Sequence, residues 1–131
     1  MIFLDTCYFK ALIDKRDPYH KTALKIKKYL SDENKETMVN TTVVVETLNK
    51  SFKIKFPIDE LFNNLHEDNK VVELTHQDYL KSLEISGWFD NSINYSDCTI
   101  VETMLEENVS NIVTFDSDFK KIKFFNVIYD I

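Results

Sequence analysis

The sequence predicts an α/β fold in which a mostly parallel central sheet is covered by helices on both faces, giving three layers. Short apolar runs alternate along the chain with longer segments whose apolar residues recur at helical spacing. Two of the apolar runs stop abruptly at a carboxylate, as MIFL does at Asp5 and IVTF does at Asp116. Because the ligand crevice of a parallel sheet lies beyond the carboxyl ends of its strands, this pattern indicates one pocket built from distant segments.

Length and composition favour a single domain over residues 1–131. The 131 residues are 44% hydrophobic and include ten Phe and six Tyr, which is enough to bury a core without disulfides. Only two cysteines are present, Cys7 and Cys98, and their scarcity favours a reducing, cytoplasmic compartment. The first apolar run is interrupted at Asp5, so it does not resemble a signal peptide, and no membrane span is expected.

The first strand is expected at Ile2–Leu4 and the first helix at Thr6–Ile13. Asp17 followed by Pro18 predicts the start of a second helix, with Asp17 as N-cap and Pro18 in the first helical position. The apolar residues of this helix recur at helical spacing: Tyr19, Ala23, Ile26 and Leu30.

A second strand is expected at Thr37–Asn40. Thr41 or Thr42 then caps a helix that runs to about Phe52, and a further helix follows Pro57. This fourth helix spans Ile58 to His66, and two acidic residues in its first turn favour it through the helix dipole: Asp59 and Glu60.

The next strand candidate is Val71–Leu74. Thr75 caps a helix that ends near Gly87 and carries three large apolar residues: Leu80, Leu83 and Trp88. Ser96 is the expected cap of the following helix. Its apolar face consists of four residues: Ile100, Val101, Met104 and Leu105.

The chain is expected to finish with a strand at Asn111–Thr114, a short turn or helix at Ser117–Lys121 and a closing strand at Val127–Tyr129. Strands that alternate with helices in this way imply βαβ units and parallel pairing.

Four acidic residues occupy positions that meet at one edge of such a sheet. Asp5 and Asp116 follow strands directly, Glu46 lies one turn into the helix after the second strand, and Asp97 lies in the first turn of its helix. Each acid alone has an ordinary role as a helix cap or an exposed helix residue. Together they would repel one another by a few kcal/mol, so their convergence predicts a bound cation. Carboxylate oxygens suit Mg²⁺ or Mn²⁺, which points to phosphate chemistry.

Several other classes of protein are excluded. The single glycine, Gly87, rules out both dinucleotide-binding and P-loop motifs. The three histidines show no metal-type spacing and are expected at the surface or near helix ends: His20, His66 and His76. A net charge of −6 argues against broad, non-specific nucleic-acid binding, although acids at a metal site would be neutralised by the ion.

Four segments, taken in order, resemble the PIN-domain ribonucleases, and within them the VapC-type toxins of toxin–antitoxin pairs. The segments are FLDTCYF, TTVVVETLNK, NYSDCTIVETM and IVTFDSDFKKI, and they extend over nearly the whole chain. The resemblance implies an α/β/α fold and a metal-dependent endoribonuclease that hydrolyses RNA phosphodiester bonds. It also implies a family quartet that holds magnesium or manganese: Asp5, Glu46, Asp97 and Asp116.

The resemblance assigns supporting roles to further residues. Thr6 and Thr114 match polar positions beside the acids and would hydrogen-bond the ligand carboxylates. Asp118 matches a position that is acidic in only some members of the family. The stretch that starts at Cys98 departs from the family, where it is often rich in alanine, and both Cys98 and Cys7 are expected to be small buried packing residues.

For partners, the resemblance implies an RNA substrate, an antitoxin whose tail covers the acidic groove, and a homodimer formed through helices. Four aromatic residues are candidates for such surfaces, although packing in the core is the default expectation: Phe52, Phe56, Phe62 and Trp88.

Alternative functions remain open from sequence alone. Within the same fold, the chain is either a toxin, a housekeeping RNA-processing nuclease, or a non-catalytic domain that binds a partner. Outside it, a haloacid-dehalogenase-type phosphatase needs a second Asp where Cys7 stands, and a receiver domain needs paired acids near the N-terminus and a late lysine.

Overall fold

A five-stranded, wholly parallel sheet forms the centre of the computed structural model, which describes residues 1–131. Its strands occur in the spatial order β3-β2-β1-β4-β5, and every neighbouring pair is parallel. The strands are β1 (Ile2–Leu4), β2 (Thr37–Asn40), β3 (Lys70–Val72), β4 (Asn111–Val113) and β5 (Asn126–Ile128).

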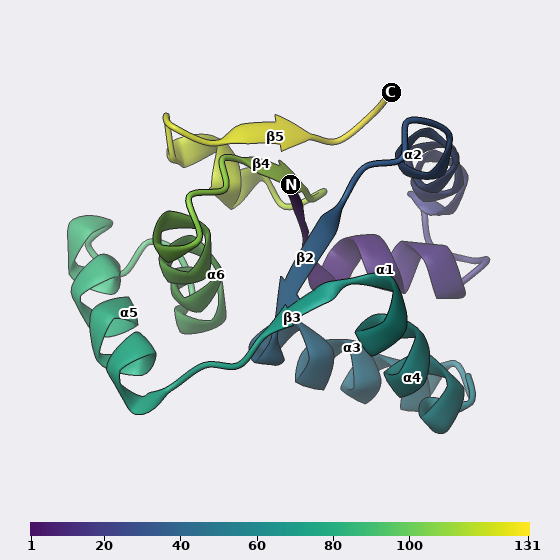
Figure 1. The fold of residues 1–131 in the computed structure, drawn as a ribbon, viewed down its shortest axis with the longest axis horizontal. Coiled ribbons are helices and arrows are strands. Elements are labelled where there is room, and N and C mark those ends of the chain that lie inside the picture. Colours follow the sequence, from purple (N-terminus) through teal and green to yellow (C-terminus); the bar gives the residue numbers. More distant parts are fainter.

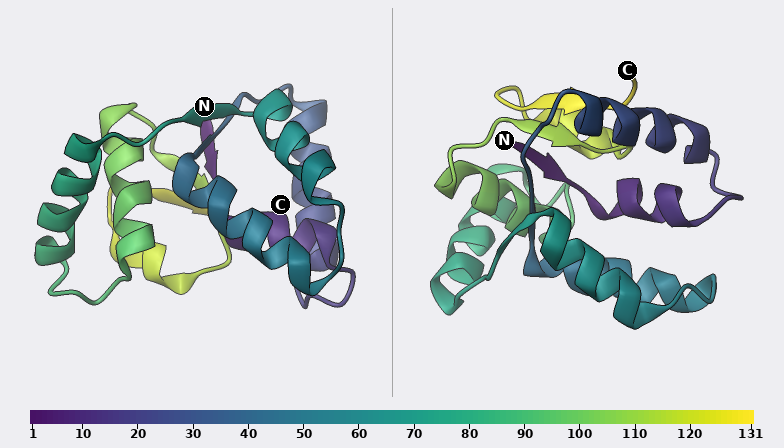
Figure 2. Two further views of the ribbon diagram at one scale, coloured as in Figure 1. Left: turned by 90° about the horizontal axis from the view of Figure 1, so that it is seen from below. Right: turned by 45° about the vertical axis from the view of Figure 1, so that its right-hand side comes forward.

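Six α-helices and one 3₁₀ helix connect the strands. They are α1 (Thr6–Ile13), α2 (His20–Asp32), α3 (Thr41–Lys53), α4 (Ile58–Asp68), α5 (His76–Trp88), α6 (Tyr95–Glu106) and η1 (Ser117–Lys121). Figures 1 and 2 show α5 and α6 side by side on one side of the sheet, with α1, α3 and α4 on the other. Right-handed crossovers explain this arrangement, because the chain steps away from β1 in opposite directions before and after β3. The predicted three-layer α/β/α architecture is confirmed.

The core lies at the middle of the sheet, under α6. Phe3 of β1 and Ile112 of β4 are completely buried. Ile100, Val101 and Met104 of α6 belong to the same hydrophobic core, whereas Leu105 is exposed. Cys98 is also fully buried, which confirms the expectation that it packs in the core.

Helix caps differ from the predicted ones at two places that matter for the site. Asn40, the last residue of β2, caps α3 by accepting a hydrogen bond from the amide of Val43 at 3.0 Å, so neither of the two following threonines is the cap. Asn94 caps α6 instead of Ser96. Both segments offer several residues with short polar side chains, and only the path of the chain into each helix selects one of them.

The start of α2 was also predicted wrongly. Asp17 is not an N-cap, because the helix begins at His20 and no side chain caps it. The Asp17 carboxylate instead accepts hydrogen bonds from the Lys10 ammonium at 2.7 Å and from the Tyr19 amide at 2.8 Å. Tyr19 therefore lies outside the helix and is half exposed.

Strand boundaries shift by a residue or two at the sheet edges. The third strand begins at Lys70 and ends at Val72, and the fifth ends at Ile128, because pairing with the neighbouring strand decides where a short strand stops. The apolar residues that the sequence places on α5 are not buried: Leu80, Leu83 and Trp88 are all exposed. None of the helices has both the length and the apolar character that crossing a bilayer requires.

Candidate active site

Asp5 anchors the site at the carboxyl end of the central strand β1. It is buried and caps α1, accepting a hydrogen bond from the amide of Thr6 at 2.7 Å. The hydroxyl of Thr114, which follows β4, donates to the other carboxylate oxygen at 2.8 Å. Burial raises the pKa of Asp5, the hydrogen bonds from Thr114 and Thr6 oppose this effect, and the negative charge of Asp116 adds to it.

Glu46 reaches the same region from α3. The Thr6 hydroxyl donates a hydrogen bond to Glu46 Oε2 at 3.3 Å, so one threonine contacts two acids, one through its backbone and one through its side chain. This contact joins the end of β1 to the first turns of α3, which follow the neighbouring strand β2.

Three further acids form the tightest group. Single carboxylate oxygens of Asp97, Asp116 and Asp118 all lie within 4.8 Å of one another. Asp116 caps η1 by accepting a hydrogen bond from the amide of Asp118 at 2.9 Å, and the Asp116 amide donates to Thr114 Oγ1 at 3.0 Å. Local turn geometry therefore presents two acids from η1 to the acid at the start of α6.

Asp97 is the electrostatic centre of the group. Burial is the largest cause that raises the pKa of Asp97 to about 8, and the negative charges of four other acids raise it further: Asp5, Asp116, Glu46 and Asp118. Four acids from the ends of two strands, one helix and one 3₁₀ helix thus lie within electrostatic reach of the Asp97 carboxylate. The structure therefore brings the acids that the sequence singled out to the same region.

The residues of this group fit a divalent cation. Asp97 Oδ2 is buried and has no hydrogen-bond partner. A buried carboxylate oxygen without a partner is costly, and a cation would satisfy it. All the available donors are carboxylate oxygens, and the donor set contains no histidine, so it suits Mg²⁺ or Mn²⁺ and not Zn²⁺. Asp97, Asp116 and Asp118 would hold such an ion most directly.

Cys7 differs from the packing residue that the sequence predicted. It is only partly buried, and its sulfur lies 3.5 Å from Asp5 Oδ2 and 3.3 Å from Thr114 Oγ1. The amide of Phe115 donates to this sulfur at 3.2 Å. Burial and the charge of Asp5 raise the pKa of the thiol to about 12, so Cys7 stays protonated beside the acids.

Sequence reasoning missed the residue that joins the two helices carrying Glu46 and Asp97. Asn40 is fully buried, and its side-chain amide donates to the carbonyl of Thr99 at 3.3 Å and to Thr103 Oγ1 at 3.0 Å. Since it also caps α3, Asn40 helps to hold α3 against α6, together with the hydrogen bond from the Thr99 hydroxyl to Thr42 Oγ1 at 3.0 Å. A polar residue that ends an apolar strand was the only signal for it in the sequence.

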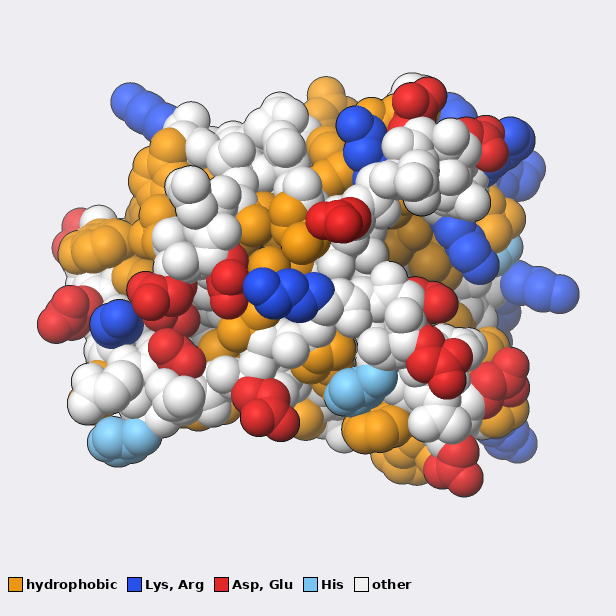
Figure 3. All heavy atoms as spheres, in the orientation of Figure 1, with side chains coloured by type: hydrophobic (Ala, Val, Ile, Leu, Met, Phe, Trp, Pro, Cys, Tyr) orange, Lys and Arg blue, Asp and Glu red, His pale blue; other side chains and the backbone are white.

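Charges elsewhere on the surface are mixed. Figure 3 shows Lys and Arg side chains interspersed with Asp and Glu over the visible face, without a broad basic area. Lys121 forms an ion pair with Asp118 at 3.1 Å, so one basic residue already lies at the margin of the acidic group.

Solved structures with this fold include several toxins. VapC20 of Mycobacterium tuberculosis, described as a sarcin-ricin loop cleaving toxin, superposes with a TM-score of 0.81 at 22% identity over 95% of this chain and 96% of that one. A toxin–antitoxin complex from Klebsiella pneumoniae gives a TM-score of 0.76 at 16% identity over 100% of both chains. VapBC2 of Rickettsia felis, bound to a DNA fragment from its promoter, gives a TM-score of 0.72 at 17% identity over 98% of both chains.

No curated protein sequence matches the chain. The family model of the PIN domain, however, matches residues 2–125. That match includes the segments around all five acids described above and nearly the full length of the chain. The protein therefore belongs to the PIN domain family.

Proposed function

We propose that this protein is a metal-dependent endoribonuclease that hydrolyses RNA phosphodiester bonds and acts as the toxin of a toxin–antitoxin pair. The observation that carries the proposal is the convergence of Asp97, Asp116 and Asp118 within 4.8 Å, with one buried Asp97 oxygen left without a partner. Membership of the PIN domain family supports nuclease activity, and the likeness of the fold to VapC toxins supports the toxin role.

Each acid has a distinct task in this proposal. Asp97, Asp116 and Asp118 hold the ion, and Asp5 and Glu46 ligate it directly or through water. When bound, Mg²⁺ or Mn²⁺ lowers the pKa of a coordinated water and offsets the negative charge of the phosphate. Asp116 lies at the partly exposed margin of the group, where its carboxylate is suited to orient the attacking water.

The two threonines keep the acids in position. Thr114 holds Asp5 from β4, and Thr6 holds Glu46 from the start of α1, so neither carboxylate is free to rotate away from the ion. Both hydroxyls are buried, which protects these hydrogen bonds from competition by water. The pair therefore supplies the preorganisation that hydrolysis at a metal centre requires.

Exposed aromatic residues support the antitoxin and homodimer that the toxin role implies. Phe52, Phe62 and Trp88 are 65%, 45% and 61% exposed, contrary to the default expectation that they pack in the core, whereas Phe56 is partly buried. Large exposed aromatic side chains are typical of surfaces that bind a protein partner.

Cleavage of a labelled RNA tests the enzymatic part. Protein stripped of metal with a chelator is expected to be inactive and to recover activity when Mn²⁺ is added. The Asp97→Asn variant is expected to lose roughly 100-fold or more in rate, because it removes an anionic ligand that stabilises the ion. Asp59→Asn, an exposed acid of α4, is the matched control and should retain full activity. Full activity of both Asp97→Asn and Asp5→Asn would contradict the site assignment.

Two further experiments separate the toxin from the alternatives. Induced synthesis of the chain in a bacterial host is expected to arrest growth, and the Asp97→Asn variant is expected not to. Mn²⁺-dependent cleavage without growth arrest would favour a housekeeping RNA-processing nuclease. A folded protein that cleaves no RNA with either ion would favour a non-catalytic domain that binds a partner.

A further inference from the structure

A cavity of about 200 Å³ lies immediately beside the acidic group, and the function proposed above does not use it. Six of its lining residues matter here: Tyr19, Thr114, Phe115, Asp116, Lys120 and Tyr129. Asp116 belongs to the acidic group, and Thr114 holds Asp5, so the cavity and the acids share a wall. The cavity is formed by three distant segments, which are the corner before α2, the turn after β4 and the chain after β5.

Two tyrosines present their rings at this cavity. Tyr19 is 48% exposed and Tyr129 is 55% exposed, and both line the cavity. Aromatic faces that stay accessible in a hollow are suited to stack on a flat ring. Since one water takes up only about 30 Å³ in the liquid, the cavity has room for a ring-sized ligand.

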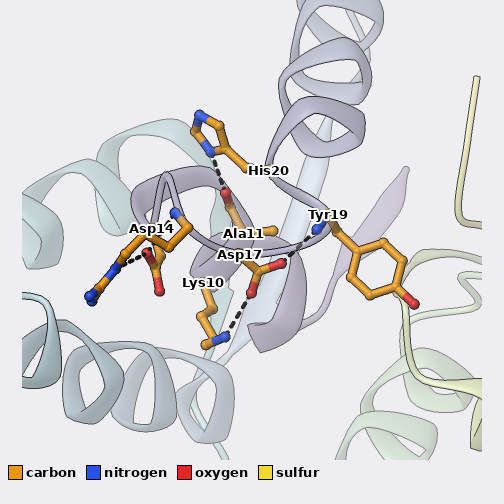
Figure 4. Close-up of polar contacts among 7 residues, drawn as sticks. Lys10, Ala11, Asp14, Asp17, Tyr19 and His20 are labelled. Atoms are coloured by element: carbon orange, nitrogen blue, oxygen red, sulfur yellow. Dashed lines mark hydrogen bonds and ion pairs between the residues drawn. The ribbon is translucent and has the colours of Figure 1, made fainter.

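The ring of Tyr19 is held in place before any ligand arrives. One face stacks on Phe115 with 4.5 Å between ring centroids and 4° between planes. Its backbone is fixed as well, because Asp17 accepts a hydrogen bond from the Tyr19 amide and is itself held by Lys10. Figure 4 shows the two hydrogen bonds of the Asp17 carboxylate, with the Tyr19 side chain directed away from Lys10 and Asp17.

The same corner is secured from the other side by His20, whose ring Nδ1 lies 2.7 Å from the carbonyl oxygen of Ala11 (Figure 4). Side-chain contacts of Asp17 and His20 therefore reinforce the backbone hydrogen bonds of the corner between α1 and α2, whereas no side chain caps α2. This arrangement also gives a role to Asp17, which the sequence had assigned to capping α2: it fixes the position of Tyr19.

Lys120 supplies a positive charge to the cavity. Its ammonium lies 4.4 Å from the centroid of the Tyr129 ring. It forms no ion pair with any carboxylate, whereas its neighbour Lys121 is paired with Asp118. Next to a group of acids that repels phosphate, an unpaired lysine that contacts an aromatic ring offers both the charge and the stacking surface that a nucleotide needs.

We infer that this cavity binds one unpaired nucleotide of the RNA substrate, adjacent to the phosphate that is cleaved. The base stacks on the exposed tyrosine faces, and Lys120 contacts its phosphate. Stacking of this kind needs a base that has left its own stack, so the protein acts on single-stranded RNA or on loops. That the ligand is RNA rests on the proposed nuclease function. The inference adds the cavity as the place where the RNA strand is held beside the acids.

Binding of a fluorescein-labelled, short single-stranded RNA, measured by anisotropy in a chelator, tests the inference apart from catalysis. Tyr129→Leu is expected to weaken binding by roughly tenfold, the effect of losing one base–aromatic stack. Lys120→Met is expected to weaken it too, and to reduce the slope of log affinity against log salt by about 0.7, since one phosphate contact is lost. Tyr129→Leu should leave that slope unchanged.

A matched variant guards against loss of structure. Tyr79→Leu removes an exposed aromatic residue of α5 that does not line the cavity, and it is expected to have no effect on RNA binding. A blunt duplex of the same sequence should bind equally to all variants. If Tyr129→Leu melts well below the unmodified protein, the change in salt slope with Lys120→Met decides the outcome.

The inference and the proposed function fail in different ways. Unchanged RNA binding by both Tyr129→Leu and Lys120→Met would overturn the nucleotide site, even if Mn²⁺-dependent cleavage and its loss in Asp97→Asn are observed. Absence of cleavage with a clear loss of RNA binding in both variants would overturn the nuclease and leave the nucleotide site standing. Loss of binding to a protein partner, with RNA binding intact, would assign the cavity to that partner and overturn the inference.

Discussion

The hydroxyl of Thr114 donates a 2.8 Å hydrogen bond to the carboxylate of Asp5, a residue 109 positions earlier in the chain. Both residues lie at the carboxyl edge of neighbouring parallel strands, β1 and β4. The same hydroxyl oxygen accepts a hydrogen bond from the amide of Asp116 at 3.0 Å. One buried hydroxyl therefore fixes two acids of the site: it donates to the side chain of Asp5 and accepts from the backbone amide of Asp116.

Replacing Thr114 by valine is expected to destabilise the protein and weaken ion binding. Valine keeps the shape but leaves a buried Asp5 oxygen and the Asp116 amide short of a partner, at a cost of about 1–3 kcal/mol. Urea denaturation and titration with Mn²⁺ measure the two effects. Thr114→Ser keeps the hydroxyl, so it is expected to restore most of the stability and most of the affinity for Mn²⁺. Equal losses in the serine and valine variants would show that the methyl group matters and not the hydrogen bond.

Asn40→Ala is expected to be more damaging than its size suggests. The change removes the cap of α3 and both hydrogen bonds to α6, for a loss of about 3 kcal/mol in the free energy of unfolding. Because α3 carries Glu46 and α6 carries Asp97, cleavage should fall as well. The control is Asn126→Ala, whose side chain makes one exposed hydrogen bond and should change stability by less than about 0.5 kcal/mol.

Glu102 is expected to make the protein less stable as the pH rises. It is buried between α6 and α5, and its Oε1 has no hydrogen-bond partner. Burial raises the pKa of Glu102 to about 7 from the ordinary value of 4.5, and the charges of Asp78 and Glu106 add to this effect while Lys81 opposes it. The folded state then holds the proton more tightly than the unfolded state. The resulting stability is full below about pH 4.5 and is lost as the pH rises through about 7.

Glu102→Gln tests this directly, because glutamine is neutral at every pH. At about pH 8 the variant should be more stable than the unmodified protein, by at most about 3 kcal/mol. Below about pH 4.5 the difference should vanish. Thermal melting between about pH 4 and 8 measures this difference in stability. The control is Glu84→Gln, a change of an exposed residue that should leave the pH dependence of stability unchanged. A constant difference at all pH values would contradict the role of the Glu102 proton.

Affinity for Mn²⁺ is expected to depend on pH through Asp97. The pKa of Asp97 is raised to about 8, so below that pH the ion has to displace a proton. Apparent affinity should rise by about tenfold for each pH unit up to about pH 8 and level off above it. Calorimetric titration in buffers of different ionisation enthalpy measures both the affinity and the proton released. The Asp97→Asn variant should bind Mn²⁺ more weakly, and its affinity should depend less on pH. If the affinity of the unmodified protein for Mn²⁺ does not change between about pH 6 and 8, the ion does not displace this proton.

Element types and approximate positions were predictable, because they depend on local pattern. The apolar runs at β1, β2 and β4 are short and bounded, and α1, α3 and α6 have apolar residues at helical spacing, so each was found within a residue or two. Caps were less predictable. Asn40, Thr41 and Thr42 are all acceptable caps by type, and the choice of Asn40 depends on its side chain also reaching α6, which is a tertiary contact.

Burial of individual side chains was the least predictable feature. Leu80 and Leu83 of α5 are three residues apart, a spacing typical of one helix face, yet both are exposed. α5 packs against α6, and its buried apolar residue is Ile85. Tyr19 was expected inside a helix and instead lines the cavity beside the acids. In each case the missing information is which neighbour packs against the element.

By itself, the sequence determined that carboxylates follow apolar runs in an α/β chain, since a parallel sheet brings strand ends to one edge whatever the details of packing. It also predicted the chemical type of the site, because a set of oxygen donors without histidine favours a hard cation. Tertiary structure alone decided which acids lie closest together and which oxygen lacks a partner. Those properties depend on distances of a few ångströms between segments far apart in the chain, and local sequence pattern does not encode them.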